Sequence, residues 1–242
     1  SKPFVQLETT RGCFNTCAFC VSGGEKPVRT LSIESIRRRL QLIHAHGIKN
    51  VRVLDRTFNY NPRRAKELLR LFLEFHPDIR FHLEIHPALL SEELKEELSL
   101  LPKGLLHLEA GIQSLREPVL EKSRRMGKLS DALDGLRFLC ALPNMETHAD
   151  LIAGLPLYHL HEIFEDVRTL AEYAAGEIQL ESLKLLPGTE MRRRAEESGI
   201  KYSPLPPYEV LQTHEINVSE LQTARQLSRL LDGFYNTPAW QA

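Results

Sequence analysis

Residues 13–20 read Cys-Phe-Asn-Thr-Cys-Ala-Phe-Cys, and this stretch decides what the rest of the chain is expected to build around it. Its cysteines, Cys13, Cys17 and Cys20, are spaced Cys-x3-Cys-x2-Cys, and the 242 residues hold only one other, Cys140. A [4Fe–4S] cluster takes one thiolate per iron, so three clustered thiolates leave one iron open to a further ligand. The spacing therefore predicts a cluster that takes part in chemistry rather than a structural metal site.

Two simpler uses of these cysteines agree less well with the sequence. Structural zinc needs four ligands, commonly from a second Cys or His pair, and the sequence has no second Cys pair. A disulfide would leave an odd thiol, and nothing else points to secretion. Cys140 lies in the apolar run 136–142, where a cysteine is expected to act as a small core hydrophobe rather than as a ligand.

The composition is that of a soluble globular protein, with 42% hydrophobic and 26% charged residues. No stretch approaches the ~20 consecutive apolar residues of a membrane span. The net charge is −1, so no broad electrostatic bias toward nucleic acid is expected. Basic runs at 37–39 and 192–194 are expected to be solvated helix faces. Unprotected thiols favour a reducing cytoplasm.

Strand and helix patterns alternate along about the first 190 residues. Strands are expected at 4–9, 51–55, 80–86, 105–111, 147–152 and 178–185. Helices are expected from Ser32, after Asn61-Pro62, from Ser91, from about 115, from Ser130, from about His161 and through 191–194. Ser32 is a favourable N-cap, and Asn61-Pro62 is a cap followed by Pro at the first helical position. Six βα units imply a parallel sheet with right-handed crossovers.

The number of units predicts the kind of α/β fold. Eight βα units would close a barrel of ~250 residues, so six predict a partial (βα)6 TIM-like barrel, which we expect over residues 1–190. Residues 191–242 are expected to form a C-terminal helical extension that packs on the barrel, because a proline-rich connection at 203–208 precedes an amphipathic helix. The apolar positions of that helix are Leu221, Ala224, Leu227 and Leu231.

Polar side chains occupy one face of several predicted strands, although a parallel sheet buried on both faces should be apolar. Alternation places His82, Glu84 and His86 on one face of the 80–86 strand. Other strands carry similar sets: His107 with Glu109, His148 with Asp150, Gln179 with Glu181, and Asp55 at a strand end. Such groups would cost several kcal/mol if buried without partners, so we expect a wet or ligand-filled lumen. Satisfied hydrogen bonds are one alternative, and a second metal ion on His82, Glu84 and His86 is another.

The cysteine spacing, with Phe19 before the third cysteine and Arg11-Gly12 after a short strand, resembles the cluster loop of the radical S-adenosylmethionine (SAM) superfamily. The resemblance implies that Cys13, Cys17 and Cys20 hold a [4Fe–4S] cluster whose open iron chelates SAM. One electron from the reduced cluster then cleaves SAM to methionine and a 5′-deoxyadenosyl radical, while the protein positions and shields the reactants. By the same resemblance, Phe19 is expected to pack near the cluster and the adenine.

Segments at the ends of the predicted strands resemble SAM-contacting segments of the superfamily. Asp55 or Thr57 stands where the family has its motif for the methionine amino group, although the usual Gly-Gly-Glu is absent there. The Gly23-Gly24-Glu25 that does occur follows the cysteines directly, and we expect it to be a turn. Glu109 resembles an acidic residue that faces SAM.

The later strand ends carry the remaining expected SAM contacts. Arg125, which we expect on the helical segment after the 105–111 strand, resembles an arginine that pairs with the SAM carboxylate, a task suited to a guanidinium group. The neighbouring Arg124 is the alternative. Ile152 and Gly154 resemble a motif that packs on the adenine, where glycine allows close approach of the backbone. Leu186 resembles a strand end whose backbone groups read the adenine.

The resemblance covers residues 1 to about 190 and is closest to one subgroup, on the segments 55–59, 186–189 and 206–211. Members of that subgroup carry a cobalamin-binding domain before the core and a C-terminal region of unassigned function. Nothing in residues 1–242 resembles a cobalamin site, so cobalamin is expected only through a domain outside this chain.

The resemblance implies a radical SAM enzyme, with cobalamin-dependent methyl transfer or a rearrangement as the reaction of the parent protein. Its substrate, a small molecule, a lipid precursor or a peptide, is expected among Glu84, His86 and Glu181, with a flavodoxin or ferredoxin as electron donor. The near-neutral charge argues against a nucleic-acid partner. Two alternatives stay open: a non-catalytic iron–sulfur redox or sensor protein, and a zinc-dependent barrel hydrolase.

Overall fold

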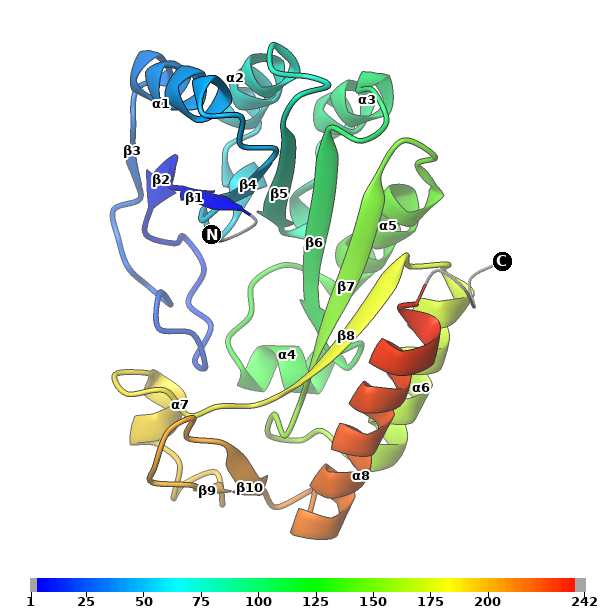
Figure 1. Cartoon of the computed structure of the whole chain (residues 1–242). Coiled ribbons are helices and arrows are strands. Elements are labelled where there is room, and N and C mark those ends of the chain that lie inside the picture. Colours follow the sequence, from blue (N-terminus) through cyan, green and yellow to red (C-terminus); the bar gives the residue numbers. More distant parts are fainter. Residues whose placement is uncertain (1–3, 238–242) are drawn as a thin grey trace. The chain divides into compact units, whose positions relative to one another are not determined.

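A computed structural model describes residues 4–237 of the chain (Figure 1). Six strands form one sheet in the order β1-β4-β5-β6-β7-β8. Their bounds are β1 Val5–Leu7, β4 Asn50–Val53, β5 Arg80–Ile85, β6 Leu106–Gln113, β7 Glu146–Ala153 and β8 Glu177–Ser182. The pairs β1–β4, β4–β5 and β5–β6 are parallel, and the order in the sheet follows the order in the chain. The predicted six-stranded α/β fold is confirmed.

The chain divides into two compact units. The first unit takes the chain up to residue 14, residues 25–111 and residues 130–148. The second unit takes residues 15–24, residues 112–129 and the chain from residue 149 onward. The chain therefore passes from one unit to the other inside the cysteine stretch.

The helices of the first unit begin where the sequence predicts. They are α1 Ile33–Ala45, α2 Pro62–Leu73, α3 Glu92–Leu100 and nearly all of α5 Leu129–Ala141, with short 3-10 turns at η1 Phe58–Tyr60 and η2 Pro87–Leu89. Ser32, Asn61 and Ser91 cap α1, α2 and α3, because each side-chain oxygen accepts a hydrogen bond from the backbone N–H three residues on. Helix α1 packs on α2, and α2 packs on α3 (Figure 1).

Strand β5 has one apolar face and one polar face. Phe81 is fully buried, and its ring stacks on that of Phe72 from α2, with centroids 4.1 Å apart and planes 11° apart. Leu83 is also buried on this face, whereas His82 and Glu84 alternate with them and are half-buried. This alternation follows from strand geometry and places the polar face away from the apolar core of the first unit.

The second unit is built around strand β8. Its helices are α4 Glu117–Lys122, α6 Leu160–Glu172, α7 Glu190–Arg193 and α8 Val218–Leu230, which continues into a π-helical turn, η3 Leu231–Tyr235. Helix α8 packs against β8 and α6 (Figure 1), and its residues Leu221 and Ala224 are buried, so the predicted terminal amphipathic helix is confirmed. The antiparallel pair β9 Lys201–Tyr202 and β10 Val210–Gln212 was not predicted, because strands this short show no alternation.

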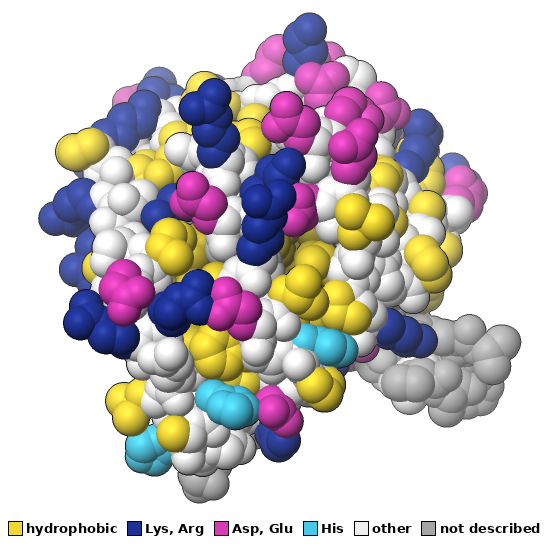
Figure 2. Space-filling view, turned by 90° about the horizontal axis from the view of Figure 1, so that it is seen from above, with side chains coloured by type: hydrophobic (Ala, Val, Ile, Leu, Met, Phe, Trp, Pro, Cys, Tyr) yellow, Lys and Arg dark blue, Asp and Glu magenta, His cyan; other side chains and the backbone are white. Residues whose placement is uncertain are grey.

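The surface carries both signs of charge. On the face drawn in Figure 2, basic and acidic side chains are interspersed with hydrophobic ones among the residues that are coloured. Within residues 4–237, no helix combines the length and the apolar character needed to cross a membrane.

Candidate functional site

The cysteines lie on a segment, residues 12–28, that we call the cysteine loop, and a short ladder joins its two ends. Strands β2 (Thr10–Arg11) and β3 (Arg29–Thr30) pair antiparallel on either side of it. The N–H of Leu31 then donates to the carbonyl of Thr9 at 3.0 Å. These hydrogen bonds close the loop at its base without the help of a ligand.

Two polar contacts, one buried and one half-buried, hold this base to the segment after β4 and to α2. Asp55, 1% exposed, accepts hydrogen bonds from the backbone N–H groups of Thr9 and Thr10, each at 2.8 Å, and from the Thr9 hydroxyl. Arg64 donates from Nη2 to the carbonyls of Thr9 and Leu31, at 3.2 and 2.7 Å. Asp55 therefore positions the loop, and its expected contact with SAM stays a prediction. No sequence pattern points to Arg64, which is one arginine among several on the helices.

The thiols of the loop suit an iron–sulfur cluster. All four cysteines of the chain lie in the described part, and they form no disulfide. Cys13 and Cys17 are 8% and 6% exposed, and Cys20 is half-buried. In the first unit, Sγ of Cys13 lies 3.9 Å from Oγ1 of Thr57. Soft thiolates held in a partly dry loop are the donors that such clusters take, so the residues present fit the group that the sequence predicts.

The middle of the loop belongs to the second unit, where a tight turn shapes it. The N–H of Cys20 donates to the Cys17 carbonyl at 3.2 Å, and the N–H of Gly23 donates to the Cys20 carbonyl at 3.0 Å. A Cβ atom on Gly23 would lie 2.4 Å from the Cys17 carbonyl oxygen, so only glycine fits this close approach. The predicted turn at residues 23 and 24 is confirmed.

Backbone bonds attach this part of the loop to the end of α4 and to α7. The N–H of Ala18 donates to the Ser123 carbonyl at 2.9 Å, and the N–H of Met191 donates to the Ala18 carbonyl at 2.8 Å. The side-chain oxygen of Asn15 accepts from the N–H of Met126 at 3.1 Å. The segment between Cys17 and Cys20 is thus fixed by groups from distant parts of the sequence.

The structure separates the two arginines that the sequence left as alternatives. Arg125 directs Nη1 at Sγ of Cys17, 3.8 Å away, whereas Arg124 forms an ion pair with Glu190 on α7. Both residues follow the end of α4 rather than lying on it, which corrects the expectation that Arg125 belongs to a helix. A guanidinium beside a thiolate ligand is placed to favour negative charge there, so Arg125 is the stronger candidate.

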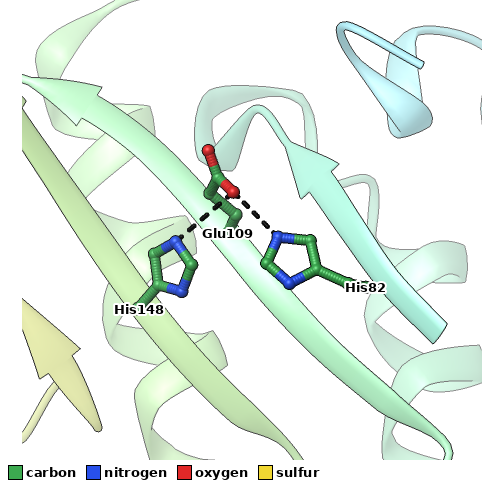
Figure 3. Close-up of side chains that lie close together, drawn as sticks. All are labelled: His82, Glu109 and His148. Carbon is green, nitrogen blue, oxygen red and sulfur yellow. Dashed lines mark hydrogen bonds and ion pairs between the residues drawn. The ribbon is translucent and has the colours of Figure 1, made fainter. Parts of the chain in front are cut away.

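In the first unit, polar side chains from three consecutive strands converge (Figure 3). His82 on β5 and His148 on β7 direct Nε2 at the same oxygen, Oε2, of Glu109 on β6, at 2.8 and 3.5 Å. Nε2 of His107 lies 2.8 Å from Nδ1 of His148, and Nη2 of Arg80 lies 3.0 Å from Nδ1 of His107. Burial alone would raise the pKa of Glu109, but the hydrogen bonds from His148 and His82 outweigh it and lower that pKa.

This convergence differs from the predicted metal set. The ligand atoms of His82, Glu109 and His148 all lie within 4.8 Å of one another, and the trio His82, Glu84 and His86 is not among such groups in the described residues. Strand alternation places His82 and Glu84 on one face, but the two side chains meet different partners, Glu109 and Arg56. The zinc-hydrolase alternative loses the ligand set on which it rested.

Glu84 is an acid with an unusual environment. Burial, together with the charge of Glu109, raises the pKa of Glu84 to about 7. Arg56 opposes this rise, with Nη1 3.7 Å from Oε1 of Glu84. A carboxyl group with a pKa near 7 can both give and accept a proton at neutral pH, which suits a group facing a substrate.

His86, the second expected substrate contact, lies just beyond β5 and is 4% exposed. The Asn59 side chain forms two hydrogen bonds with the backbone of His86. It accepts one from the His86 N–H at 2.8 Å and donates one to the His86 carbonyl at 2.9 Å. The ring of Phe14, next to Cys13, lies 6.3 Å from the His86 ring. His86 is therefore held rigidly close to the start of the cysteine loop.

A buried carboxylate of the second unit, Asp166 on α6, fixes the turn after β6. It accepts hydrogen bonds from the hydroxyl of Tyr158 at 2.6 Å, the N–H of Leu115 at 2.8 Å and Nε of Arg116 at 2.9 Å. Asp166 and Tyr158 are both 0% exposed. Burial raises the pKa of Asp166, and the hydrogen bond from Tyr158 opposes that rise. The sequence did not reveal this residue, since an acid within an amphipathic helix usually faces water.

The remaining expected SAM contacts lie in the second unit. Gly154 has φ +91°, which favours glycine, and a Cβ atom there would face Leu183, Val210 and Leu221. Ile152 and Leu186 are half-buried, and Phe19 lies in the turn between Cys17 and Cys20 with the same partial burial. Glu181 is exposed and lies 3.4 Å from Lys184. Contacts of these residues with SAM or substrate stay predictions.

Comparison with known proteins places this geometry in a family. The model of the radical SAM superfamily matches residues 7–170, and a model described as a protein of unknown function, DUF4080, matches residues 196–242. One curated relative is tRNA-2-methylthio-N(6)-dimethylallyladenosine synthase of Herpetosiphon aurantiacus, 25% identical over 202 residues that make up 77% of this chain and 44% of that protein. Another is ribosomal protein uS12 methylthiotransferase RimO of Desulfitobacterium hafniense, 25% identical over 186 residues, or 72% of this chain and 40% of that protein.

The chain spans less than half the length of these two relatives. Among solved structures, the radical S-adenosylmethionine methyltransferase TsrM of Kitasatospora setae, with tryptophan and a SAM analogue bound, has a TM-score of 0.70 at 20% identity. The match covers 93% of this chain and 45% of that one, and it confirms the predicted partial-barrel fold. Because the superfamily model matches more than half of its residues, the chain belongs to the radical SAM superfamily of enzymes.

Proposed function

We propose that the chain binds a [4Fe–4S] cluster through Cys13, Cys17 and Cys20 and uses it to cleave SAM. The observation that carries the proposal is the cysteine loop itself: three cysteines without a disulfide, on a loop whose base is closed by a ladder, Asp55 and Arg64. Four cysteines would complete such a cluster, and the absence of a fourth from the loop leaves a coordination position for SAM. When bound, the cluster and SAM supply a one-electron cleavage that yields methionine and a 5′-deoxyadenosyl radical.

The residues of the chain would hold and shield these groups. Arg125, next to Cys17, is proposed to neutralise negative charge at the thiolate or at the SAM carboxylate. The Thr57 hydroxyl, 3.9 Å from the Cys13 sulfur, is proposed as a polar contact to that ligand. The other expected SAM contacts are kept as proposals: Phe19, Asp55, Glu109, Ile152, Gly154 and Leu186.

We propose that the substrate meets Glu84 and His86, with Glu181 as a further candidate. Glu84 would exchange a proton with it, and His86 would help to position it, because Asn59 fixes the His86 backbone. The solved neighbour TsrM, a methyltransferase, holds cobalamin and a [4Fe–4S] cluster, which supports methyl transfer with cobalamin supplied by a domain outside this chain. A rearrangement is kept as the other proposed reaction. Small molecules, lipid precursors and peptides all remain proposed substrate classes.

Two further proposals concern the setting of the reaction. A flavodoxin or ferredoxin would supply the electron that reduces the cluster. Thiols that form no disulfide suit a reducing compartment, so we propose that the enzyme works in the cytoplasm.

The test is the formation of 5′-deoxyadenosine, detected by mass spectrometry after anaerobic reconstitution with iron and sulfide and incubation with SAM and dithionite. We expect product from the wild-type chain and a loss of more than about 100-fold in Cys13→Ala, Cys17→Ala and Cys20→Ala. Cys140→Ala is the matched control and should keep full activity, because Cys140 lies on α5, away in sequence from the cysteine loop.

A separate measurement distinguishes the alternative of a non-catalytic iron–sulfur protein. Adding SAM to the dithionite-reduced cluster should change its electron paramagnetic resonance signal if SAM binds at the open position. An intact, reduced cluster with an unchanged signal and no 5′-deoxyadenosine would contradict the proposed function and favour the redox or sensor role.

A further inference from the structure

Glu109, which the sequence predicts to face SAM, also meets His82 and His148 in a three-strand convergence that the proposed SAM chemistry does not explain (Figure 3). Two imidazole nitrogens and one carboxylate oxygen meet with separations of 2.8 and 3.5 Å to Oε2 of Glu109, and all the ligand atoms lie within 4.8 Å of one another. His148 is buried, and the other two residues are half-buried. Burying polar groups at this depth costs folding free energy unless each group has a hydrogen-bond partner or a partner of opposite charge.

The strand register explains how the three side chains meet. His82 pairs with His107 across β5 and β6, and Glu84 pairs with Glu109, so Glu109 lies two residues beyond the position opposite His82. Its longer side chain covers that distance and meets the imidazole. On β5 and β6, His82 and Glu109 alternate with buried apolar residues and so share one face, and His148 on β7 reaches the same carboxylate oxygen from the other side of β6.

Two imidazoles and one carboxylate form a recognised donor set. Catalytic zinc sites often use two histidines and one glutamate, and the same set with open positions binds non-haem iron(II). Donor atoms about 2 Å from a common tetrahedral ion lie roughly 3.3 Å apart, close to the spacing seen here. We propose that His82, Glu109 and His148 bind one divalent transition-metal ion of the zinc or iron(II) type, with a coordination position left for a further ligand.

The residues around the set would orient its ligands. Nε2 of His107 lies 2.8 Å from Nδ1 of His148, which fixes the His148 ring with Nε2 toward Glu109. Ligating histidines usually have such a hydrogen-bond partner on the other ring nitrogen. The proposal is independent of the cysteine loop, whose sulfur atoms belong to a different donor class.

Zinc is the probe, because the iron of the cluster can then be counted separately. The reconstituted, cluster-loaded chain is dialysed anaerobically against a small excess of zinc sulfate, and zinc and iron are measured by mass spectrometry. We expect one zinc ion per chain in addition to about four irons. Glu109→Gln and His148→Ala should weaken zinc binding by more than tenfold without changing the iron content, since even changes around a ligand cost about 10–100-fold.

His46→Ala is the matched control, because His46 is an exposed histidine of the same unit, and it should keep its zinc. X-ray absorption at the zinc edge of the wild-type protein needs no variant and so remains informative if a variant fails to fold. Nitrogen and oxygen neighbours at about 2.0–2.1 Å support the site, whereas sulfur at about 2.3 Å would place zinc in the cysteine loop and overturn it. Zinc retention by Glu109→Gln equal to wild type, or no zinc in the wild type, would also overturn it, and neither result bears on 5′-deoxyadenosine formation.

Discussion

The protonation of the Glu84 carboxyl group depends on its surroundings, and a substitution of this one residue can test that dependence. Burial and Glu109 raise its pKa to about 7 from a value of 4.5. The unfolded chain releases this proton near pH 4.5, while the folded chain keeps it until about pH 7. The folded protein therefore binds more protons in between, and its stability falls as the pH rises from about 5 to 7.

Glu84→Gln removes this ionisation. We expect the wild-type chain to lose about 2 kcal/mol more of its unfolding free energy than the variant between pH 5 and pH 7.5, a figure reduced for the partial exposure of the side chain. Urea denaturation under anaerobic conditions at the two pH values measures it. Glu34→Gln, an exposed glutamate on α1, is the control and should follow the wild type. Parallel curves for wild type and Glu84→Gln would show that Glu84 has an ordinary pKa.

At the scale of an element, Asp166 joins α6 to the turn that follows β6. Its carboxylate bonds Tyr158, Leu115 and Arg116 with no exposure to water. Asp166→Ala leaves the buried Tyr158 hydroxyl and the Leu115 N–H without their acceptor, whereas Arg116 keeps its ion pair with Glu165. The variant should therefore cost about 2–4 kcal/mol of unfolding free energy. Tyr158→Phe removes one hydrogen bond and should cost about 1 kcal/mol.

Urea denaturation compares these variants with Glu172→Gln, an exposed change on the same helix that should cost less than 0.5 kcal/mol by the usual behaviour of surface sites. A cost for Asp166→Ala no larger than that of the control would mean that the turn is held by other contacts.

The helices and strands show which features the sequence could predict. Helix starts were predictable because capping is local: Ser32, Asn61 and Ser91 each bond a backbone group three residues away. Strand alternation likewise predicted that polar side chains share one face. The partners of Glu109 were not predictable, because alternation fixes the face of a side chain but not its neighbour on the next strand.

The contacts that support the site lie beyond the reach of such patterns. Arg64 bonds the Thr9 carbonyl 55 residues away, and Asp166 bonds the Leu115 N–H 51 residues away. Neither has a local sequence signature, so only the folded chain reveals them. By contrast, the spacing of three cysteines is a local signal, and it was sufficient to point to the family that the comparison then showed.

At the scale of the whole molecule, charge sets an expectation for RNA. Two curated relatives carry names that refer to tRNA and to a ribosomal protein, but this chain has a net charge of −1 and mixed charges on the face in Figure 2. Proteins bind nucleic acid without sequence preference through clustered basic side chains. We expect no saturable binding of a bulk tRNA mixture below about 10 μM in filter binding at 50 mM salt.

A tRNA-modifying relative serves as the positive control in the same assay. Micromolar binding by this chain that weakens steeply between 50 and 200 mM salt would contradict the expectation, because that salt dependence is the signature of phosphate contacts. It would direct the search for a substrate toward RNA.

The ladder at the base of the cysteine loop affects what happens to the loop when oxygen destroys a bound cluster. Air destroys exposed iron–sulfur clusters, and a binding loop held together only by its metal would then come apart. Here β2, β3, Asp55 and Arg64 keep the ends of the loop together by hydrogen bonds that involve no sulfur. We therefore expect that loss of a cluster would leave the ends of the loop in place, so that fresh iron and sulfide could refill it without the loop having to fold again.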